Sequence, residues 1–275
     1  MAKSLIIVFD HLSDRGMKRA DNQDNFGKFP EDDSALTNPQ GQFFIVADGM
    51  GGHAGGKEAS AMAVELVQQA YFGDSSVDIP QSLRRAMEAA NAQIYQRASS
   101  GPEFQGMGTT CTVLVFKNDR VYVAHVGDSR AYRITKTQIE QITKDHSKVA
   151  EMQRLGILTA EEAKHHPEKS HLYRALGIAA ALQADIIADL PPLQSSERFL
   201  LCTDGISKVE AREIKNIVMS NPPAAACRML IDLANARGGS DNSTVQVIAI
   251  EKAASARQGI LSAWRRLRSE KIKAR

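Results

Sequence analysis

The segment IVADGMGGHAGG, residues 45–56, joins an apolar run to a turn that contains five glycines and one histidine, His53. Such a run predicts a buried strand, which here stops at an acidic residue, Asp48. Glycines after a strand allow the backbone of a neighbouring segment to approach closely. The segment therefore predicts a central strand of the fold and a functional site at the end of that strand.

Three other acidic residues occupy comparable positions. Asp128 follows the run VAHVG, Asp204 follows FLLCT, and Asp241 precedes STVQVIAI. A single Asp-Gly pair is most often an ordinary turn, but the recurrence predicts that these strand ends share one edge of the fold. Asp24, in RADNQDNFG, is interpreted as part of a polar loop beyond the first strand.

The rest of the chain shows strand and helix patterns in separate groups. Apolar runs bounded by turn residues predict strands at 5–9, 43–47, 110–116, 121–126, 131–134, 186–190, 199–202 and 244–250. Apolar residues spaced by three and four predict helices around 59–70, 83–94 and 226–234. Asn118-Asp119 predicts a tight hairpin, and Thr159 with Glu162 predicts a capping box. Because helices and strands do not alternate regularly, the pattern favours an α+β fold with antiparallel sheets and helices outside.

Composition limits the class of protein. A chain of 275 residues with 43% hydrophobic content can form one large domain with a full core. Three cysteines, Cys111, Cys202 and Cys227, are too few for a disulfide framework, so we expect reduced, buried thiols and a cytoplasmic location. No apolar run approaches the length of a membrane span, and we expect a soluble body.

Carboxylates that converge repel one another unless a cation lies between them. Two of them about 4 Å apart repel by roughly 4 kcal/mol at an effective dielectric constant near 20. All candidate ligands are oxygens, without a CxxC or a helical His pair, so the sequence favours Mg or Mn over Zn. Two such ions would activate a bridging water for in-line attack on a phosphoryl group, which predicts phosphoester hydrolysis.

Two cationic or titratable side chains fit this chemistry. Arg19 could grip the phosphate oxygens as a bidentate fork. His53 could donate a proton to the leaving alkoxide, although a lone histidine is more often structural. Among the other histidines, His125 is expected to be packed inside a strand, and His146 is expected to brace its loop.

Eight ordered segments resemble one known family. They are RADNQDNFG, VADGMGGHAGG, GTTCTVLV, AHVGDSRAYR, TKDHS, RALG, LLCTDG and SDNSTVQV. Together they are similar to the motifs of the metal-dependent type 2C (PPM) serine/threonine protein phosphatases of bacteria, from about residue 16 to residue 250. The resemblance implies a four-layer α-β-β-α sandwich, with two antiparallel sheets flanked by helices, that hydrolyses phosphoserine and phosphothreonine in proteins.

The resemblance also implies a set of metal ligands for two Mn or Mg ions. Asp48 would bridge both ions and Gly49 would contribute its carbonyl oxygen. Asp204 would complete the coordination of one ion and Asp241 that of the other. Asp128 would bind a third, weaker ion together with Asp204.

Further roles follow from the same motifs. Arg19 matches the phosphate-binding arginine, Asp24 the acid that holds metal-bound waters, and His53 the proposed general acid. Ser129 and Asn242, each directly after a candidate metal ligand, are additional site candidates. Gln23 departs from the glutamate of many eukaryotic relatives, and we interpret it as a feature of the bacterial branch.

The resemblance divides the chain into a catalytic domain, residues 1–250, with a variable flap at about 147–176, and a tail. Residues 251–275 carry eight Lys or Arg against two Glu, which leaves a mildly acidic body. That balance argues against a nucleic-acid-binding domain. The tail fits two interpretations: a solvated, disordered segment, or an amphipathic helix that contacts an anionic membrane or an acidic partner.

Other classes remain to be distinguished. A cysteine phosphatase needs an arginine six positions after its nucleophile, and none of the three cysteines has one. An Asp-x-Asp nucleophile pair is also absent from the sequence. A phosphoprotein-binding pseudoenzyme would normally lose a metal-binding acid, whereas Asp48, Asp204 and Asp241 are all present. We therefore expect a monomeric enzyme whose partners are phosphoproteins, the substrates of a Ser/Thr protein kinase.

Overall fold

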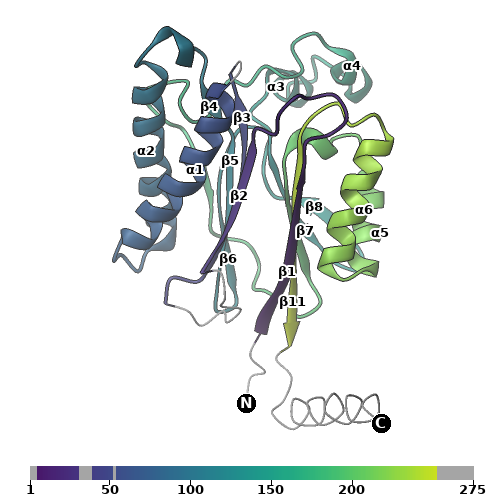
Figure 1. The fold of residues 1–275 in the computed structure, drawn as a ribbon. Coiled ribbons are helices and arrows are strands. Elements are labelled where there is room, and N and C mark those ends of the chain that lie inside the picture. The colour runs from purple at the N-terminus through teal and green to yellow at the C-terminus, as the bar shows by residue number, and fades with distance from the viewer. Residues whose placement is uncertain (1–4, 31–38, 52–53, 253–275) are drawn as a thin grey trace, which may run out of the picture.

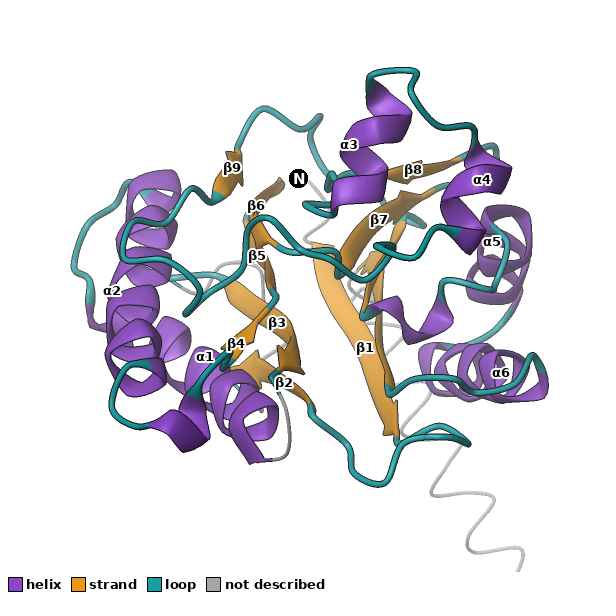
Figure 2. Cartoon of the chain, turned by 90° about the horizontal axis from the view of Figure 1, so that it is seen from above, coloured by secondary structure: helices purple, strands orange, loops and turns teal. Residues whose placement is uncertain are grey.

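Two antiparallel sheets lie face to face, and a pair of helices covers the outer face of each (Figures 1 and 2). The structure is a computed structural model that describes residues 5–30, 39–51 and 54–252. The predicted α+β class and its antiparallel sheets between helical layers are confirmed. The tail from residue 253 onward, for which the sequence leaves a disordered segment and an amphipathic helix open, lies outside the described residues.

The first sheet contains the strand that ends in the glycine-rich turn. Its strand order is β2-β3-β5-β6-β9, and the short strand β4 pairs with β3. These strands are β2 (Asp24–Phe29), β3 (Gln42–Met50), β4 (Gly108–Thr109), β5 (Cys111–Lys117), β6 (Arg120–Val126) and β9 (Asp185–Ile187). The central strands β3 and β5 are almost wholly buried, because helices cover one face and the second sheet covers the other.

The second sheet has the order β1-β11-β10-β7-β8. Its strands are β1 (Leu5–Asp14), β7 (Arg130–Ile134), β8 (Ile139–Gln141), β10 (Arg198–Cys202) and β11 (Ser243–Lys252). The first and last strands of the described chain pair along their full lengths, from Leu5 opposite Lys252 to Asp14 opposite Ser243. This register places the start of β11 next to the loop that follows β1.

The helices form two packed pairs and one excursion. The first sheet is covered by α1 (Ala54–Gly73) and α2 (Ile79–Ala98), and the second by α5 (Ala211–Ser220) and α6 (Pro223–Ala236). The excursion between β8 and β9 carries α3 (Lys148–Arg154) and α4 (Ala160–His165). Two short 3-10 turns complete the described elements, η1 (Pro102–Phe104) and η2 (Asp204–Ile206).

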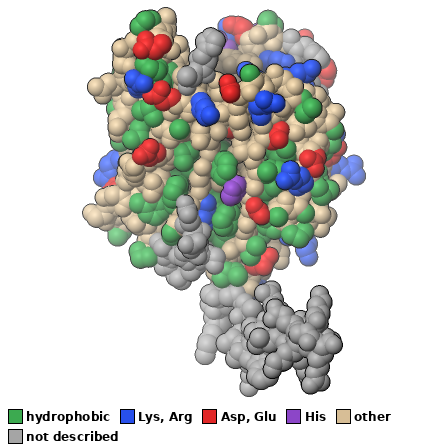
Figure 3. Space-filling view, viewed as in Figure 1, with side chains coloured by type: hydrophobic (Ala, Val, Ile, Leu, Met, Phe, Trp, Pro, Cys, Tyr) green, Lys and Arg blue, Asp and Glu red, His purple; other side chains and the backbone are tan. Residues whose placement is uncertain are grey.

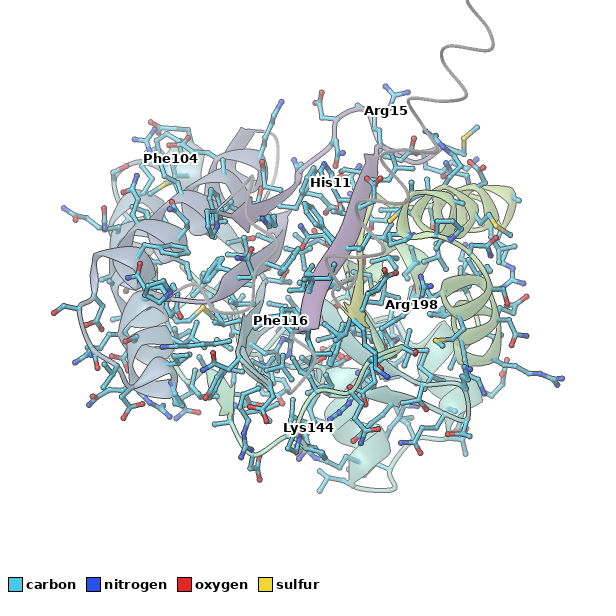
Figure 4. The ribbon with its side chains drawn as sticks, turned by 90° about the horizontal axis from the view of Figure 1, so that it is seen from below. His11, Arg15, Phe104, Phe116, Lys144 and Arg198 are labelled. Carbon is cyan, nitrogen blue, oxygen red and sulfur yellow. The ribbon has the colours of Figure 1, made fainter. Side chains whose placement is uncertain are left out.

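The core has one layer between the sheets and one layer under each helix pair. In the middle layer, Phe116 packs edge-on against Phe44 and Phe199, with ring centroids 5.7 and 5.1 Å apart. Phe116 is labelled in Figure 4. Edge-to-face pairs of this kind add to the free energy gained by burial. The two sheets are thus held together by large rings from β3, β5 and β10.

Local signals in the sequence account for several boundaries. Asp78 accepts a hydrogen bond from the Gln81 N–H as the N-cap of α2, and α6 begins at Pro223. Asn118 adopts a φ of 55° in the two-residue hairpin between β5 and β6. The predicted capping box of Thr159 and Glu162 is present at the start of α4. The hairpin and capping predictions are therefore confirmed.

Three predictions about elements need correction. Asp24 is not in a loop but begins β2, where only 7% of the residue is exposed. The strands β2, β4 and β8 and the helix α5 are absent from the predicted set. Polar edge segments such as DNFGKF lack an apolar run, because only part of such a strand faces the core. The bounds of two strands also differ: β1 extends to Asp14, beyond the predicted end at Phe9, and β9 ends at Ile187, before the predicted end at residue 190.

Two features of the exterior bear on the class of protein. No helix among the described residues is long and apolar enough to span a membrane. On the face shown in Figure 3, acidic and basic side chains are interspersed over the described surface. The three cysteines are free and buried, as predicted.

Candidate metal centre

Acidic residues from both sheets line one pocket of about 490 Å³ at the end of the sandwich. Its walls include the four acids that the sequence places at strand ends: Asp48, Asp128, Asp204 and Asp241. They belong to β3, the β6–β7 turn, η2 and the residues before β11. The four acids come together because of the strand directions. The ends of β3, β6 and β10 and the start of β11 lie at the same end of the two sheets.

The pocket concentrates buried negative charge. The charges of Asp24, Asp128, Asp204 and Asp241 all act on the carboxyl group of Asp48 and oppose its ionisation. Burial, followed by the charges of Asp24 and Asp204, raises the pKa of Asp48 well above its ordinary range. Burial is also the main cause that raises the pKa of Asp204 to about 6 and that of Asp128 to about 8. The protein alone therefore does not stabilise the fully ionised site.

These residues fit hydrated divalent cations. The Oδ1 atom of Asp204 is buried and lacks a hydrogen-bond partner among the described residues, and an unpaired buried carboxylate oxygen is costly. All the acids offer hard oxygen ligands. Within the described chain no three acidic, His or Cys side chains already form a closed metal site. Mg²⁺, and by the same oxygen chemistry Mn²⁺, retains several waters, so a partial set of protein ligands suffices.

The backbone around Asp48 is fixed by two threonines. The Asp48 N–H donates to Thr110 Oγ1 at 2.9 Å, and the Asp48 carbonyl accepts from Thr110 N and Thr109 Oγ1, both at 2.9 Å. Thr110 Oγ1 also lies 2.7 Å from Ser129 Oγ. Ser129 therefore supports the site from behind the pocket.

Gly49 stands where no side chain could fit. A Cβ atom there would lie 2.0 Å from the Gly56 carbonyl oxygen and 2.9 Å from that of Gln23. The Gly49 N–H donates to the same Gln23 oxygen at 3.2 Å. This close approach packs the start of α1 and the end of the 15–23 loop against the last residues of β3. Its neighbour in the turn, His53, lies outside the described residues.

Asp24 lies beneath the pocket and is not among the residues that line it. Its Oδ2 atom accepts hydrogen bonds from Thr203 Oγ1 at 2.8 Å and Thr244 Oγ1 at 2.7 Å. Its Oδ1 atom is buried without a partner among the described residues. Burial raises the pKa of Asp24 to about 7, although the two threonine hydrogen bonds act in the opposite direction. Asp24 can therefore change its protonation state near neutral pH.

Arg19 is paired with an acid of the site. Its Nη2 atom lies 2.6 Å from Asp241 Oδ2, and its side chain is 54% exposed. The Asp241 hydrogen bond is the main cause that raises the pKa of Arg19. In this arrangement the guanidinium faces the same acid that the sequence assigns to a metal. This ion pair must open before Arg19 can bind phosphate or Asp241 can bind a metal ion.

Asn242 holds the loop that carries Arg19. Its Nδ2 atom donates to the carbonyl oxygens of Arg15 at 2.9 Å and Asp21 at 2.8 Å, while its Oδ1 atom accepts from Gln23 N at 2.9 Å. Three hydrogen bonds from one amide fix both ends of the 15–23 loop. Asn242 also lines the pocket, so it supports the site from the pocket wall itself.

The excursion 147–176 borders the pocket. Ser170 and Leu172 line its wall, and isolated bridges join Ser147 to Leu172 and Thr109 to Leu176. A second cavity of about 710 Å³ extends below α3 and α4 and shares Asp128, Asp204 and Asp241 with the first. The predicted flap thus lies beside the acids.

Sequence reasoning missed the threonines that orient these acids: Thr109, Thr110, Thr203 and Thr244. Thr203 directly precedes Asp204, and this adjacency was the available signal for it. The others are not adjacent to an acid: Thr109 and Thr110 lie in GTTCTVLV, and Thr244 follows Asp241 by three residues. Their partners are fixed only by the pairing of strands.

Comparisons with known proteins agree with this geometry. The family model for protein phosphatase 2C matches residues 18–266. A serine/threonine phosphatase stp from Listeria welshimeri is 36% identical over 242 residues, which cover 86% of this chain and 93% of the relative.

Solved structures show the same likeness. The catalytic domain of the phosphatase PstP in complex with two manganese ions superposes with a TM-score of 0.77 at 31% identity, over 90% of this chain and all of that domain. The phosphatase Stp1 from Staphylococcus aureus gives a TM-score of 0.79 at 31% identity, over 88% of this chain and 94% of that one.

Proposed function

The chain belongs to the bacterial protein phosphatase 2C family of serine/threonine phosphatases, and on that premise we propose that its acidic pocket hydrolyses phosphoserine and phosphothreonine with a pair of Mn²⁺ or Mg²⁺ ions. The observation that carries this proposal is the set of buried acids in one pocket, with pKa values raised by burial and mutual repulsion. Bound cations would remove the repulsion and keep these acids ionised.

The ligand assignment follows the pocket walls. Asp48, Asp204 and Asp241 would hold the pair together with the carbonyl oxygen of Gly49, and Asp128 with Asp204 would bind a third, weaker ion. When bound, the metal pair would supply an activated water for in-line attack and would stabilise the charge that develops on the phosphoryl oxygens.

The protein's own groups would orient the reactants and move protons. Thr109 and Thr110 hold Asp48 at its strand end, and Asp24, with a pKa of about 7, would accept hydrogen bonds from waters in the site. Arg19 would turn from Asp241 to the phosphate. His53 remains our proposed donor of the proton that the leaving serine or threonine oxygen requires.

We assign residues 1–250 to one catalytic domain and segment 147–176 to a flap that contacts the polypeptide around the phosphorylated residue. The position of Ser170 and Leu172 in the pocket wall supports this assignment. The partners would then be phosphoproteins produced by a Ser/Thr protein kinase.

A peptide assay tests the proposed reaction. Matched peptides that carry phosphoserine, phosphothreonine or phosphotyrosine should be incubated with the full chain in Mn²⁺, in Mg²⁺ and in chelator. We expect phosphate release from the first two peptides with either cation and a much slower reaction with phosphotyrosine. Equal release in chelator would contradict the metal mechanism, and binding without release would indicate a phosphoprotein-binding module.

Replacement of Arg19 by Ala should lower kcat/KM for a phosphothreonine peptide by a factor on the order of 10 to 100, the value of a charge-assisted hydrogen bond to phosphate. Because Asp241 loses its ion-pair partner, the same variant should bind Mn²⁺ at least as tightly as the wild type. Steady-state kinetics and calorimetric Mn²⁺ titration measure the two effects. An equal loss of metal binding would show that Arg19 supports the fold of the site instead.

A further inference from the structure

His146, from the TKDHS segment, has no role in the mechanism above, yet it lies buried beside the pocket with 2% of its surface exposed. Its ring Nδ1 atom accepts a hydrogen bond from the Gly127 N–H at 3.1 Å. Its own backbone N–H donates to the Gly127 carbonyl oxygen at 2.7 Å. One residue therefore binds both polar backbone groups of Gly127.

Gly127 directly precedes Asp128 and needs this support. Its φ of +107° is a conformation that residues with a side chain rarely adopt, and a Cβ atom would lie 2.6 Å from the side chain of Thr110. Glycine fits here, but it also has the greatest backbone freedom. The direction of the Asp128 side chain is therefore set by the contacts that hold the turn.

The hydrogen bonds define the protonation of the His146 ring. A backbone N–H can only donate, so Nδ1 carries no proton, and the proton of the neutral ring is assigned to Nε2. Nε2 lies 3.3 Å from Asp185 Oδ2, and Arg174 Nη1 lies 3.5 Å from the other oxygen of that carboxylate. Burial lowers the pKa of His146, in agreement with a neutral ring.

His146 also directly precedes the excursion and contacts its returning part. Its carbonyl oxygen accepts from Tyr173 N at 3.0 Å, and the next residue, Ser147, forms an isolated bridge with Leu172. The turn that carries Asp128, the start of segment 147–176 and its residues 172–173 thus meet at His146.

We propose that His146 is a positioning residue whose Nδ1 acceptor fixes the direction of Asp128 and joins the Asp128 turn to segment 147–176. The inference rests on the proposed function, because it assumes that Asp128 contributes to metal binding. This role is more specific than bracing the loop, because one acceptor atom, Nδ1, positions one proposed metal ligand, Asp128.

Two amide substitutions separate this role from simple packing. In His146→Asn, the side-chain oxygen is as far along the side chain as Nδ1 and can accept from Gly127. In His146→Gln, the amide is one bond further out, at the level of Nε2, although Gln is closer to His in size. A packing role predicts that Gln is tolerated better, whereas the acceptor role predicts that Asn is.

The measurements are calorimetric Mn²⁺ titration of the full chain and phosphate release from a phosphothreonine peptide as a function of Mn²⁺. We expect His146→Gln to raise the Mn²⁺ concentration for half-maximal activity by a factor on the order of 10 to 100, typical for loss of a group that orients a ligand. His146→Asn should recover most of that loss. The exposed histidine of β1 provides a control, since His11→Asn should match the wild type.

A double-mutant cycle links the effect to Asp128. His146→Gln combined with Asp128→Asn should require no more Mn²⁺ than Asp128→Asn alone, because both changes remove the same contribution. Additive losses would overturn the inference, as would equal behaviour of the Asn and Gln variants. If the wild type itself neither binds Mn²⁺ nor releases phosphate, the proposed function fails; if it does both and the Asn variant is not rescued, only the role of His146 fails.

Discussion

Replacement of Asp48 by Asn is expected to lower phosphate release from a phosphothreonine peptide by a factor on the order of 10³ or more, because catalysis here depends on the metal pair. Asn keeps the size of the side chain and removes the charge that would bridge both ions. Asp48 lies in the pocket wall, and its backbone is held by Thr109 and Thr110. Those backbone hydrogen bonds remain in the variant, so the strand end should keep its shape.

The same substitution should not destabilise the metal-free fold. Burial and the charges of neighbouring acids raise the pKa of Asp48, so loss of its carboxylate removes an unfavourable interaction. In chelator, the melting temperature of the variant should equal or exceed that of the wild type. Asp119→Asn removes an exposed carboxylate from the hairpin at the far end of β5 and provides the matched control. A rate for Asp48→Asn close to that of the control would refute the assignment.

The part of this site that could be predicted consists of residues whose role is visible in a local pattern. Asp48, Asp128 and Asp204 each terminate an apolar run, and the runs are apolar because β3, β6 and β10 are covered on both faces. In an antiparallel sandwich, the ends of such buried strands can lie only at one end of the sheets or the other. The sequence therefore predicts which acids could converge.

The contacts that orient the acids could not be predicted, because their partners are distant in sequence. The Asp24–Thr203 hydrogen bond joins residues 179 positions apart, and the Arg19–Asp241 pair joins residues 222 positions apart. No local pattern encodes such a distance. Asp24 was also misplaced in a loop, since the strand it begins is too polar to be recognised without its partner β3.

Arg19 illustrates a second limit. Its residue type predicts that it binds phosphate, but the structure pairs it with Asp241. Opposite charges that gather for a common ligand also bind each other when the ligand is not between them. A sequence pattern can therefore name the participants of a charged site more easily than their resting contacts.

Removal of divalent cations is expected to abolish phosphate release. The metal-free fold that remains should become less stable as the pH rises. The pKa values of Asp24 and Asp128 in the metal-free fold, about 7 and about 8, exceed the ordinary value of about 3.9. The folded chain therefore holds more protons than the unfolded chain between these limits, and its stability falls as the pH rises. The loss should continue through pH 6.5 to 8. Burial lowers the pKa of His125 to about 4, so His125 acts in the opposite direction, but mainly between pH 4 and its ordinary value of about 6.5.

Metal binding should reverse this trend, because cations bind the ionised carboxylates and displace their protons. The rise in melting temperature on addition of Mg²⁺ or Mn²⁺ should be larger at pH 8 than at pH 6.5, and calorimetry should detect proton release on binding. Asp128→Asn should reduce the difference between the two pH values, whereas Asp119→Asn should not. A metal-free protein that becomes more stable between pH 6.5 and 8 would contradict the charge repulsion in the pocket, because ionisation of the buried acids would then not oppose folding.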